Sequence, residues 1–274
     1  MPTVLSINSH VVAGRVGNAA ALLAFAALGI EAYSLPTVVY SQTPGPQGFA
    51  GESLPTLQLG AILDRLASDG LAHRIDALHI GFVREADAAV RIAQFAATAR
   101  RRNPELLISL DPVLGDDGAL YVPAATAEAI RRELVPIAGL LTPNLFELGW
   151  LTGRKVWSLP EALAAARSLK APRVLVTSAP STATRTATLL CDAGGAHLVE
   201  TPRFLSAPHG AGDVLAALFL SRLLKQEAPA QALTLSVASV YDLIEAAKGE
   251  PVLPLTEHFA KLAAPASQFA PARL

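Results

Sequence analysis

The chain has 274 residues, and 51% of them are hydrophobic, which is enough to bury a large core. Lys and Arg total 22 against 23 Asp and Glu, so the net charge of −1 offers no broad electrostatic field for nucleic acid or a membrane surface to recognise. Cys191 is the single cysteine, which excludes an internal disulfide, and the chain shows neither a basic leader nor an apolar run of about 18 residues, so we expect a soluble cytoplasmic protein.

Apolar runs of strand length alternate along the chain with longer stretches of helical period. In chain order they predict a strand at residues 4–8, a helix at 18–28, a strand at 32–40, a helix at 57–68, a strand at 77–82, a helix at 86–102, a strand at 106–110, a helix at 126–133, a strand at 139–142, a helix at 160–169 and a strand at 174–178. This alternation is typical of a mostly parallel sheet that is covered by helices on both faces. We therefore predict an α/β protein with a three-layer α/β/α, doubly wound fold.

The last third of the chain departs from this alternation. Residues 184–191 and 196–200 flank Asp192-Ala-Gly-Gly195 and predict an antiparallel hairpin at one edge of the sheet, followed by helices at 211–225 and 230–247. No linker splits the chain, so we expect one domain over residues 1–262 and a frayed C-terminal tail over 263–274. Residues 41–55 are rich in Pro, Gly and Gln, and a connection of that length favours a functional loop or lid.

A glycine-rich turn runs directly into an apolar helix at Ser206-Ala-Pro-His-Gly-Ala-Gly-Asp213. The glycines permit close backbone approach, so the N–H groups of Gly210, Ala211 and Gly212 can point outward at a helix N-terminus and form an anion hole. Asp213 stands beside them, where a carboxylate can accept the proton of an attacking hydroxyl while a donor phosphate occupies the turn. The alternative is an ordinary helix start in which Asp213 interacts with the helix dipole. No Gly-x-x-x-x-Gly-Lys-Ser/Thr motif occurs, and the turn lacks the third glycine of a dinucleotide-binding motif.

Polar residues follow several of the predicted strands, and ligands bind where the carboxyl ends of parallel strands meet. Carboxylates there could organise the magnesium ion that accompanies ATP, largely through water, and hydroxyls could donate to phosphate oxygens. The candidates are Asp111, Asp116, Glu147, Thr177 and Ser178. Asn144 and Glu147, three residues apart at a predicted helix start, also fit a capping box, which is a structural role.

Six motifs stand in an order and at spacings that are together highly specific. They are Ser9-His-Val-Val-Ala-Gly-Arg-Val-Gly-Asn18, Asp111-Pro-Val-Leu-Gly-Asp116 with Tyr121-Val-Pro, Leu141-Thr-Pro-Asn-Leu-Phe-Glu-Leu148 with Leu151-Thr-Gly-Arg-Lys, Val174-Leu-Val-Thr-Ser178, Gly210-Ala-Gly-Asp213 and Ala238-Ser-Val-Tyr-Asp-Leu-Ile244. This set resembles the pyridoxal kinase family of the ribokinase superfamily. The resemblance implies a ribokinase-like fold, a homodimer, Mg-ATP as phosphate donor, often with a monovalent cation such as K⁺, and phosphorylation of the 5′-hydroxymethyl group of a vitamin B6 form in pyridoxal 5′-phosphate salvage.

The resemblance also assigns roles position by position. It makes Asp213 the catalytic base and Gly210, Ala211 and Gly212 the anion hole. The residues that it places at the nucleotide are Asp116, Asn144, Thr177 and Ser178. Those that it places in the metal region are Asp111, Asp116 and Glu147. Those that it places at the substrate are Ser9, which faces the pyridine ring, Thr43, Phe82 and Asp213.

The substrate side of the pattern departs from the family. Family members usually read Asn-Thr-Val-Gln-Phe-Ser-Asn-His-Thr where this chain has Pro36-Thr-Val-Val-Tyr-Ser-Gln-Thr-Pro44, so the His-Thr pair of the family is lost. Thr43 replaces it only after a one-residue shift, and Pro44 has no N–H to donate. Phe82 stands where the family commonly has tyrosine and lacks its hydroxyl. We therefore expect an active kinase whose preference among pyridoxal, pyridoxine and pyridoxamine can differ from its relatives. A kinase for hydroxymethylpyrimidine or another small hydroxymethyl heterocycle, and a non-catalytic module that binds B6 or nucleotide, remain the alternatives.

Overall fold

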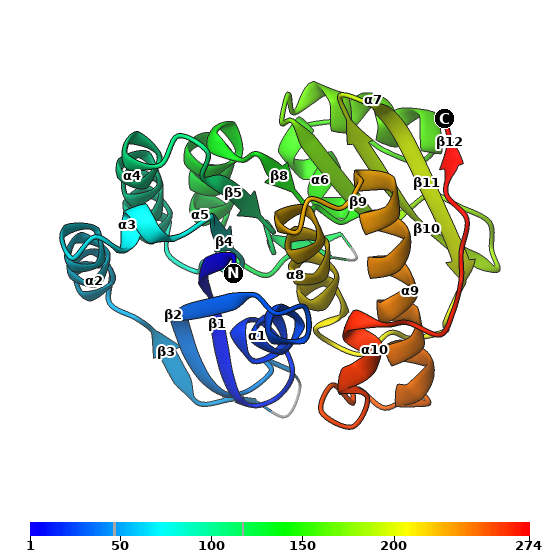
Figure 1. Ribbon diagram of the computed structural model, residues 1–274, viewed down its shortest axis with the longest axis horizontal. Coiled ribbons are helices and arrows are strands. Elements are labelled where there is room, and N and C mark those ends of the chain that lie inside the picture. Colours follow the sequence, from blue (N-terminus) through cyan, green and yellow to red (C-terminus); the bar gives the residue numbers. More distant parts are fainter. Residues whose placement is uncertain (46–47, 117) are drawn as a thin grey trace.

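The computed structural model describes residues 1–45, 48–116 and 118–274, and it shows a central sheet between two layers of helices (Figure 1). The strands are β1 (Thr3–Ala13), β2 (Glu31–Gln42), β3 (Gly51–Ser53), β4 (Ala77–Ile80), β5 (Leu107–Leu110), β6 (Gly115–Asp116), β7 (Ala119–Leu120), β8 (Leu140–Leu141), β9 (Arg173–Ala179), β10 (Arg185–Asp192), β11 (Gly195–Pro202) and β12 (Ala272–Arg273). The helices are α1 (Asn18–Ala27), α2 (Thr56–Ser68), α3 (Leu71–Arg74), α4 (Ala86–Arg102), α5 (Ala124–Ala129), η1 (Ile130–Leu134), η2 (Val135–Ile137), α6 (Leu145–Thr152), α7 (Leu159–Ser168), α8 (Ala211–Leu224), α9 (Pro229–Ala247) and α10 (Phe259–Ala263).

The described strands of the main sheet lie in the order β12-β11-β10-β9-β8-β5-β4-β1-β2-β3. Neighbours from β9 through β2 are parallel, whereas β10, β11 and β12 on one side and β3 on the other add antiparallel strands. The short strands β6 and β7 pair separately. The predicted three-layer, doubly wound fold with an antiparallel hairpin is confirmed.

Two hydrophobic cores cover the two faces of the sheet. On β1, Leu5 and Ile7 belong to the core that includes α2, α4, α5, α6 and α7, while Val4 belongs to the core that includes α1, α8, α9 and α10. Successive strand residues point to opposite faces, so a strand buried on both sides reads as a continuous apolar run. For this reason, the apolar runs in the sequence are enough to predict the central strands. Within the described ranges, no helix is long and apolar enough to cross a membrane.

Strand β1 continues past the predicted end at Asn8 as far as Ala13, and its register against β2 shifts between Asn8 and His10. Residues 9–10 are therefore part of the strand rather than of a loop after it. The polar residues Asn8, Ser9 and His10 interrupt the apolar run and hid this extension, which is paired with β2 through His10, Val11 and Ala13. The irregularity lies at the carboxyl edge, beside the predicted site.

Other predicted elements differ in detail. The segment 41–55, expected as irregular loop, contains β3, which pairs with β2 through Val38, Val39 and Tyr40, and residues 46–47 of it lie outside the described residues. The helix expected at 126–133 begins earlier, as α5, and continues as the π-helical turn η1.

The expectation of a frayed tail at 263–274 is wrong. The buried carboxylate of Asp242 on α9 accepts hydrogen bonds from the N–H of Ala266 at 2.5 Å and of Ser267 at 3.3 Å. Phe269 packs edge-on against Tyr241 with the ring centroids 5.1 Å apart, and β12 then pairs with β11. Figure 1 shows this segment, in red, running from α10 to the outer side of β11. Contacts with α9 and β11 therefore hold the end of the chain against the sheet, and the sequence of this segment alone does not predict them.

Candidate active site

The predicted anion hole lies at the start of α8. Gly210 is the N-cap residue with φ of 87°, a left-handed conformation that side-chain-bearing residues adopt only at a cost, and no side chain among the described residues caps this helix. A Cβ at this position would lie 1.9 Å from the carbonyl oxygen of Arg15, in the turn between β1 and α1. The backbone at Gly210 therefore fits closely against that turn, and the first N–H groups of α8 are available for an anion.

Asp213 lies in the first turn of α8 and is half-buried. Burial raises the pKa of its carboxyl, while hydrogen bonds from the Gly17 N–H and from the Asn8 side chain act in the opposite direction. The Nδ2 of Asn8 donates to Asp213 Oδ1 at 3.0 Å. A carboxylate beside outward-facing helix N–H groups is the arrangement that activates a hydroxyl next to a bound phosphate.

Asn8 joins Asp213 to the predicted substrate side, and sequence reasoning missed it. Its Oδ1 accepts from the N–H of Ser9 at 2.8 Å and from the N–H of Phe82 at 2.8 Å. The Phe82 carbonyl accepts from the buried hydroxyl of Thr37 at 2.6 Å. The side chain of Asn8 therefore links Ser9 and Phe82 to Asp213 by hydrogen bonds. The available signal was an asparagine, a poor strand former, at the end of an apolar strand.

A second group of predicted residues gathers at the start of α6. Asn144 and Glu147 form the expected capping box, with the Glu147 N–H donating to Asn144 Oδ1 at 2.8 Å and the Asn144 N–H donating to Glu147 Oε2 at 2.9 Å. Glu147 Oε1 also accepts from the N–H of Leu114 at 2.7 Å. Asn144 Nδ2 donates to the carbonyl of Gly115 at 2.8 Å. These bonds fasten the loop after β5 to α6.

Thr177 and Ser178 at the end of β9 lie beside this second group. Asn144 and Thr177 form an isolated parallel bridge, and the Thr177 N–H donates to the carbonyl of Pro143 at 2.9 Å. Ser178 has φ of 52°, and Val113 in the loop after β5 has φ of 44°, both in the left-handed region that these residue types rarely adopt. Backbone strain of this kind concentrates at functional sites, and the nucleotide position of Thr177 and Ser178 stays a prediction.

Asp111 connects the two groups. It is buried, and burial raises its pKa well above the ordinary value, with the negative charges of Glu147 and Asp213 adding to the shift. Burial likewise raises the pKa of Glu147 to about 7, although the N–H donors around it act in the opposite direction. The negative charges of Glu147 and Asp213 both disfavour ionisation of Asp111, so a cation bound nearby would favour the charged form of Asp111.

The donor set is incomplete for a metal held by protein alone. Within residues 1–45, 48–116 and 118–274, no group of three His, Cys, Asp or Glu side chains could hold a metal ion. Both oxygens of Glu147 already accept backbone N–H groups, so its role here is to hold the loop after β5. Asp111 and the exposed Asp116 are carboxylates suited to Mg²⁺, which keeps several waters and usually takes ligands from substrate phosphates as well.

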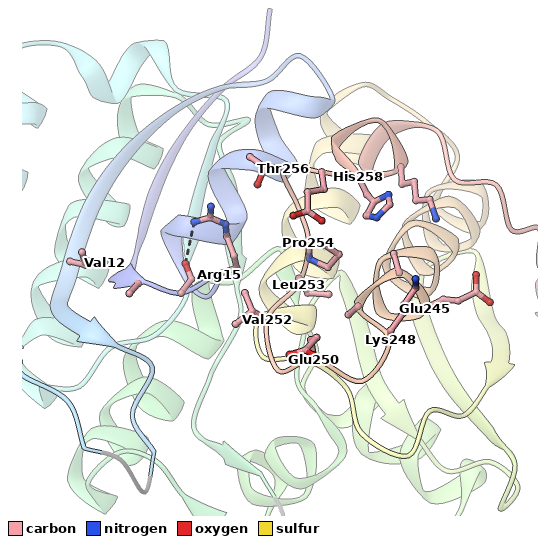
Figure 2. A pocket seen from close by; sticks show the side chains of 16 residues that line it. Val12, Arg15, Glu245, Lys248, Glu250, Val252, Leu253, Pro254, Thr256 and His258 are labelled. Atoms are coloured by element: carbon pink, nitrogen blue, oxygen red, sulfur yellow. Dashed lines mark hydrogen bonds between the residues drawn. The ribbon is translucent and has the colours of Figure 1, made fainter.

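Two hollows border the turn between β1 and α1. One of about 430 Å³ is lined by Thr43, Arg15, His209 and neighbouring loop residues, so Thr43 lies near the turn that precedes α8. A larger hollow of about 1080 Å³ lies between the β1–α1 turn and the end of α9 (Figure 2). It contains none of the predicted site residues, so its size alone does not mark it as the active site.

The fold and the site define a ribokinase-like small-molecule kinase. A family profile described as phosphomethylpyrimidine kinase matches residues 13–252. Pyridoxal kinase PdxY of Corynebacterium diphtheriae is 36% identical over 249 residues, which are 88% of each chain, and pyridoxine/pyridoxal/pyridoxamine kinase of Bordetella avium is 39% identical over 81% of this chain and 77% of its own. The structure of pyridoxal kinase from Leishmania donovani with ADP and pyridoxamine superposes over 100% of both chains with a TM-score of 0.93 and 27% identity. The chain belongs to the pyridoxal kinase family, inside the broader family that this profile describes.

Proposed function

We propose that this protein transfers the γ-phosphate of ATP to the 5′-hydroxymethyl group of pyridoxal, pyridoxine or pyridoxamine. The observation that carries the proposal is the half-buried Asp213 next to the uncapped N–H groups that begin α8. Relatives named for these three vitamers, and a structural neighbour described with ADP and pyridoxamine, support the choice of substrates.

In the proposed mechanism the vitamer hydroxyl lies within reach of Asp213 and the γ-phosphate lies against the anion hole. Because burial raises its pKa, Asp213 is a stronger base than a solvated aspartate. It accepts the hydroxyl proton as the hydroxyl oxygen bonds to the γ-phosphorus and the bond from that phosphorus to the bridging oxygen breaks, which releases ADP. The N–H groups of Gly210, Ala211 and Gly212 stabilise the negative charge that develops on the transferred group. They are held in place before the reaction by the close fit of Gly210 against Arg15.

On the nucleotide side, we assign Asn144, Thr177 and Ser178 to phosphate and ribose contacts, since they share one edge of the sheet. Asp111 and Asp116 would hold Mg²⁺ through water, and the ion would supply neutralisation of the phosphate charges. Glu147 acts by fixing the loop that carries both aspartates. A requirement for a monovalent cation such as K⁺ is tested by replacing it with Na⁺ at constant ionic strength.

On the vitamer side, we assign Ser9 and Phe82 to the pyridine ring and Thr43 to the loop that covers it. Phe82 packs against Val11, Val38 and Tyr40, which gives a flat aromatic wall without the hydroxyl that its relatives commonly place there. A ring bound mainly by stacking discriminates less between vitamers than one bound by a hydroxyl.

A second candidate is a kinase of hydroxymethylpyrimidine, which is favoured by the family profile over residues 13–252 and by the altered substrate loop. Purified protein with Mg-ATP is assayed against each B6 vitamer and against hydroxymethylpyrimidine, both alone and in competition. Phosphorylation of a vitamer with the higher kcat/KM supports the proposal. Preference for the pyrimidine favours the second candidate, and turnover of neither contradicts both.

We also infer a cytoplasmic homodimer. Supporting the dimer, the apolar side chains of Val12, Val39 and Phe49 are exposed around the β3 edge of the sheet, where a second copy would cover them. Supporting the compartment, the reaction consumes ATP and the single cysteine, Cys191, is free and buried. Light scattering on the purified protein tests the dimer, and a predominantly monomeric mass at micromolar concentration would refute it.

A further inference from the structure

The side-chain amide of Asn8 has only one orientation that satisfies its surroundings. Its Oδ1 lies 2.8 Å from the N–H of Ser9 and 2.8 Å from the N–H of Phe82. Turning the amide over would point its own N–H groups at these two donors and lose both hydrogen bonds. The Nδ2 must therefore face the opposite way, and there it meets Asp213 Oδ1 at 3.0 Å.

The backbone around Asn8 is held just as firmly. Asn18, which is buried in α1, donates from Nδ2 to the Asn8 carbonyl at 3.1 Å and accepts at Oδ1 from the Ser6 hydroxyl at 2.7 Å. Gly81 leaves space for the amide, since a Cβ there would lie 2.3 Å from the Asn8 side-chain carbon. Asn8 itself is fully buried, so water does not compete for its bonds.

We propose that Asn8 is a positioning residue for the reaction: its amide holds the Asp213 carboxylate in the orientation that receives the substrate proton and ties it to the Phe82 wall of the vitamer pocket. This inference rests on the proposed function, because it takes Asp213 as the base. A hydrogen bond to one carboxylate oxygen restricts rotation of the whole group, and misplacement of a catalytic group by about 1 Å can cost on the order of 100-fold in rate. Among the residues that the structure describes, only Asp213 accepts a hydrogen bond from Asn8 Nδ2.

The competing explanation is that Asn8 only satisfies buried backbone groups between β1 and β4. The two explanations differ in which half of the amide matters. A structural role needs Oδ1, which accepts from Ser9 and Phe82, whereas the positioning role needs Nδ2. The variant Asn8→Asp keeps the shape and the accepting oxygen and replaces only the donor with a second oxygen that repels Asp213. Asn8→Ala removes both halves and leaves two buried N–H groups without acceptors.

The test is a double-mutant cycle measured under single-turnover conditions with excess enzyme, so that slow reactions stay measurable. Asn8→Asp and Asn8→Ala are each combined with Asp213→Asn, and Ser239→Ala is the control, since Ser239 is also fully buried and its hydroxyl donates to the carbonyl of Leu262, outside this network. We expect Asn8→Asp to lower the rate of phosphoryl transfer by about 10- to 100-fold with the KM of both substrates changed by less than about threefold. In the Asp213→Asn background the same change should cost less than about threefold, because the group that Asn8 positions is already lost.

Each outcome decides between the explanations. A loss of equal size with and without the Asp213 carboxylate, or a loss expressed in KM alone, would overturn the inference and assign Asn8 a structural role. If Asn8→Ala fails to fold, Asn8→Asp still gives the comparison, because it retains the bonds to Ser9 and Phe82. The Ser239→Ala control should give the same fractional loss in both backgrounds. A wild-type protein that phosphorylates no vitamer would refute the proposed function itself, which separates that failure from failure of the role of Asn8.

Discussion

Replacement of Gly210 with alanine tests the anion hole directly. The new Cβ would lie 1.9 Å from the Arg15 carbonyl oxygen at a φ of 87°, so the substitution combines backbone strain with a contact that no rotamer change can relieve. The left-handed conformation alone costs about 1–2 kcal/mol, and the clash forces the first turn of α8 away from Arg15. Because losing one fixed donor to a developing negative charge costs on the order of 100- to 1,000-fold in kcat, we expect a kcat loss in that range.

The matched control for this prediction is Gly70→Ala. Gly70 has φ of 84°, and a Cβ there would meet nothing within 4 Å. It should therefore lose about 1 kcal/mol of unfolding free energy through strain while keeping its kcat. Urea denaturation measures the stability of both variants, and a coupled assay for ADP formation measures kcat and KM. A Gly210→Ala enzyme that is destabilised like the control but retains kcat within about threefold would refute the assignment of these amides to phosphate.

Three further predictions follow from the same contacts. Burial raises the pKa of Glu147 to about 7, so its neutral form stabilises the fold fully below about pH 4.5, and this contribution of about 3 kcal/mol is lost as the pH rises through 7. The buried His79, whose pKa is lowered to about 4, acts with the opposite sign, so we measure the difference in unfolding free energy between wild type and Glu147→Gln as a function of pH. A difference that does not change with pH would show that Glu147 is not the cause. Phe269→Ala removes the contact with Tyr241 and should lower the free energy of unfolding by about 1–2 kcal/mol in chemical denaturation, whereas an unchanged midpoint would show that the end of the chain is not fastened there. Phe82→Tyr restores a hydroxyl to the pocket wall and should change the kcat/KM ratio between pyridoxal and pyridoxamine by about 10-fold, and an unchanged ratio would place the vitamer elsewhere.

The parts of the site that the sequence predicts are those encoded locally. The turn Gly210-Ala-Gly-Asp213 combines close-approach glycines with a helix start within a few residues, and the capping box of Asn144 and Glu147 is a spacing of three. The buried parallel strands are also local, because burial on both faces requires an unbroken apolar run. Each of these elements can be recognised without knowing what lies next to it.

The parts that the sequence does not reveal depend on residues far apart along the chain. Asn8 meets Asp213 across 205 positions, and the N–H of Phe82, 74 positions away, helps to decide which way the amide faces. Similarly, Ala272 pairs with Leu198 and the carboxylate of Asp242 holds residues 266–267, although the last residues contain no strand or helix pattern. Tertiary pairing of this kind overrides the local preference of a segment.

The central claim is that Asp213 removes the proton from the substrate hydroxyl. The most direct measurement compares the rate of phosphoryl transfer and the affinity for an ATP analogue in wild type and Asp213→Asn, which preserves the shape of the side chain and removes its basic oxygen. We expect the rate to fall by about 100- to 10,000-fold and the nucleotide affinity to change by less than about threefold. A variant that keeps its rate within about tenfold of wild type would contradict the claim and reduce Asp213 to a residue of the helix start.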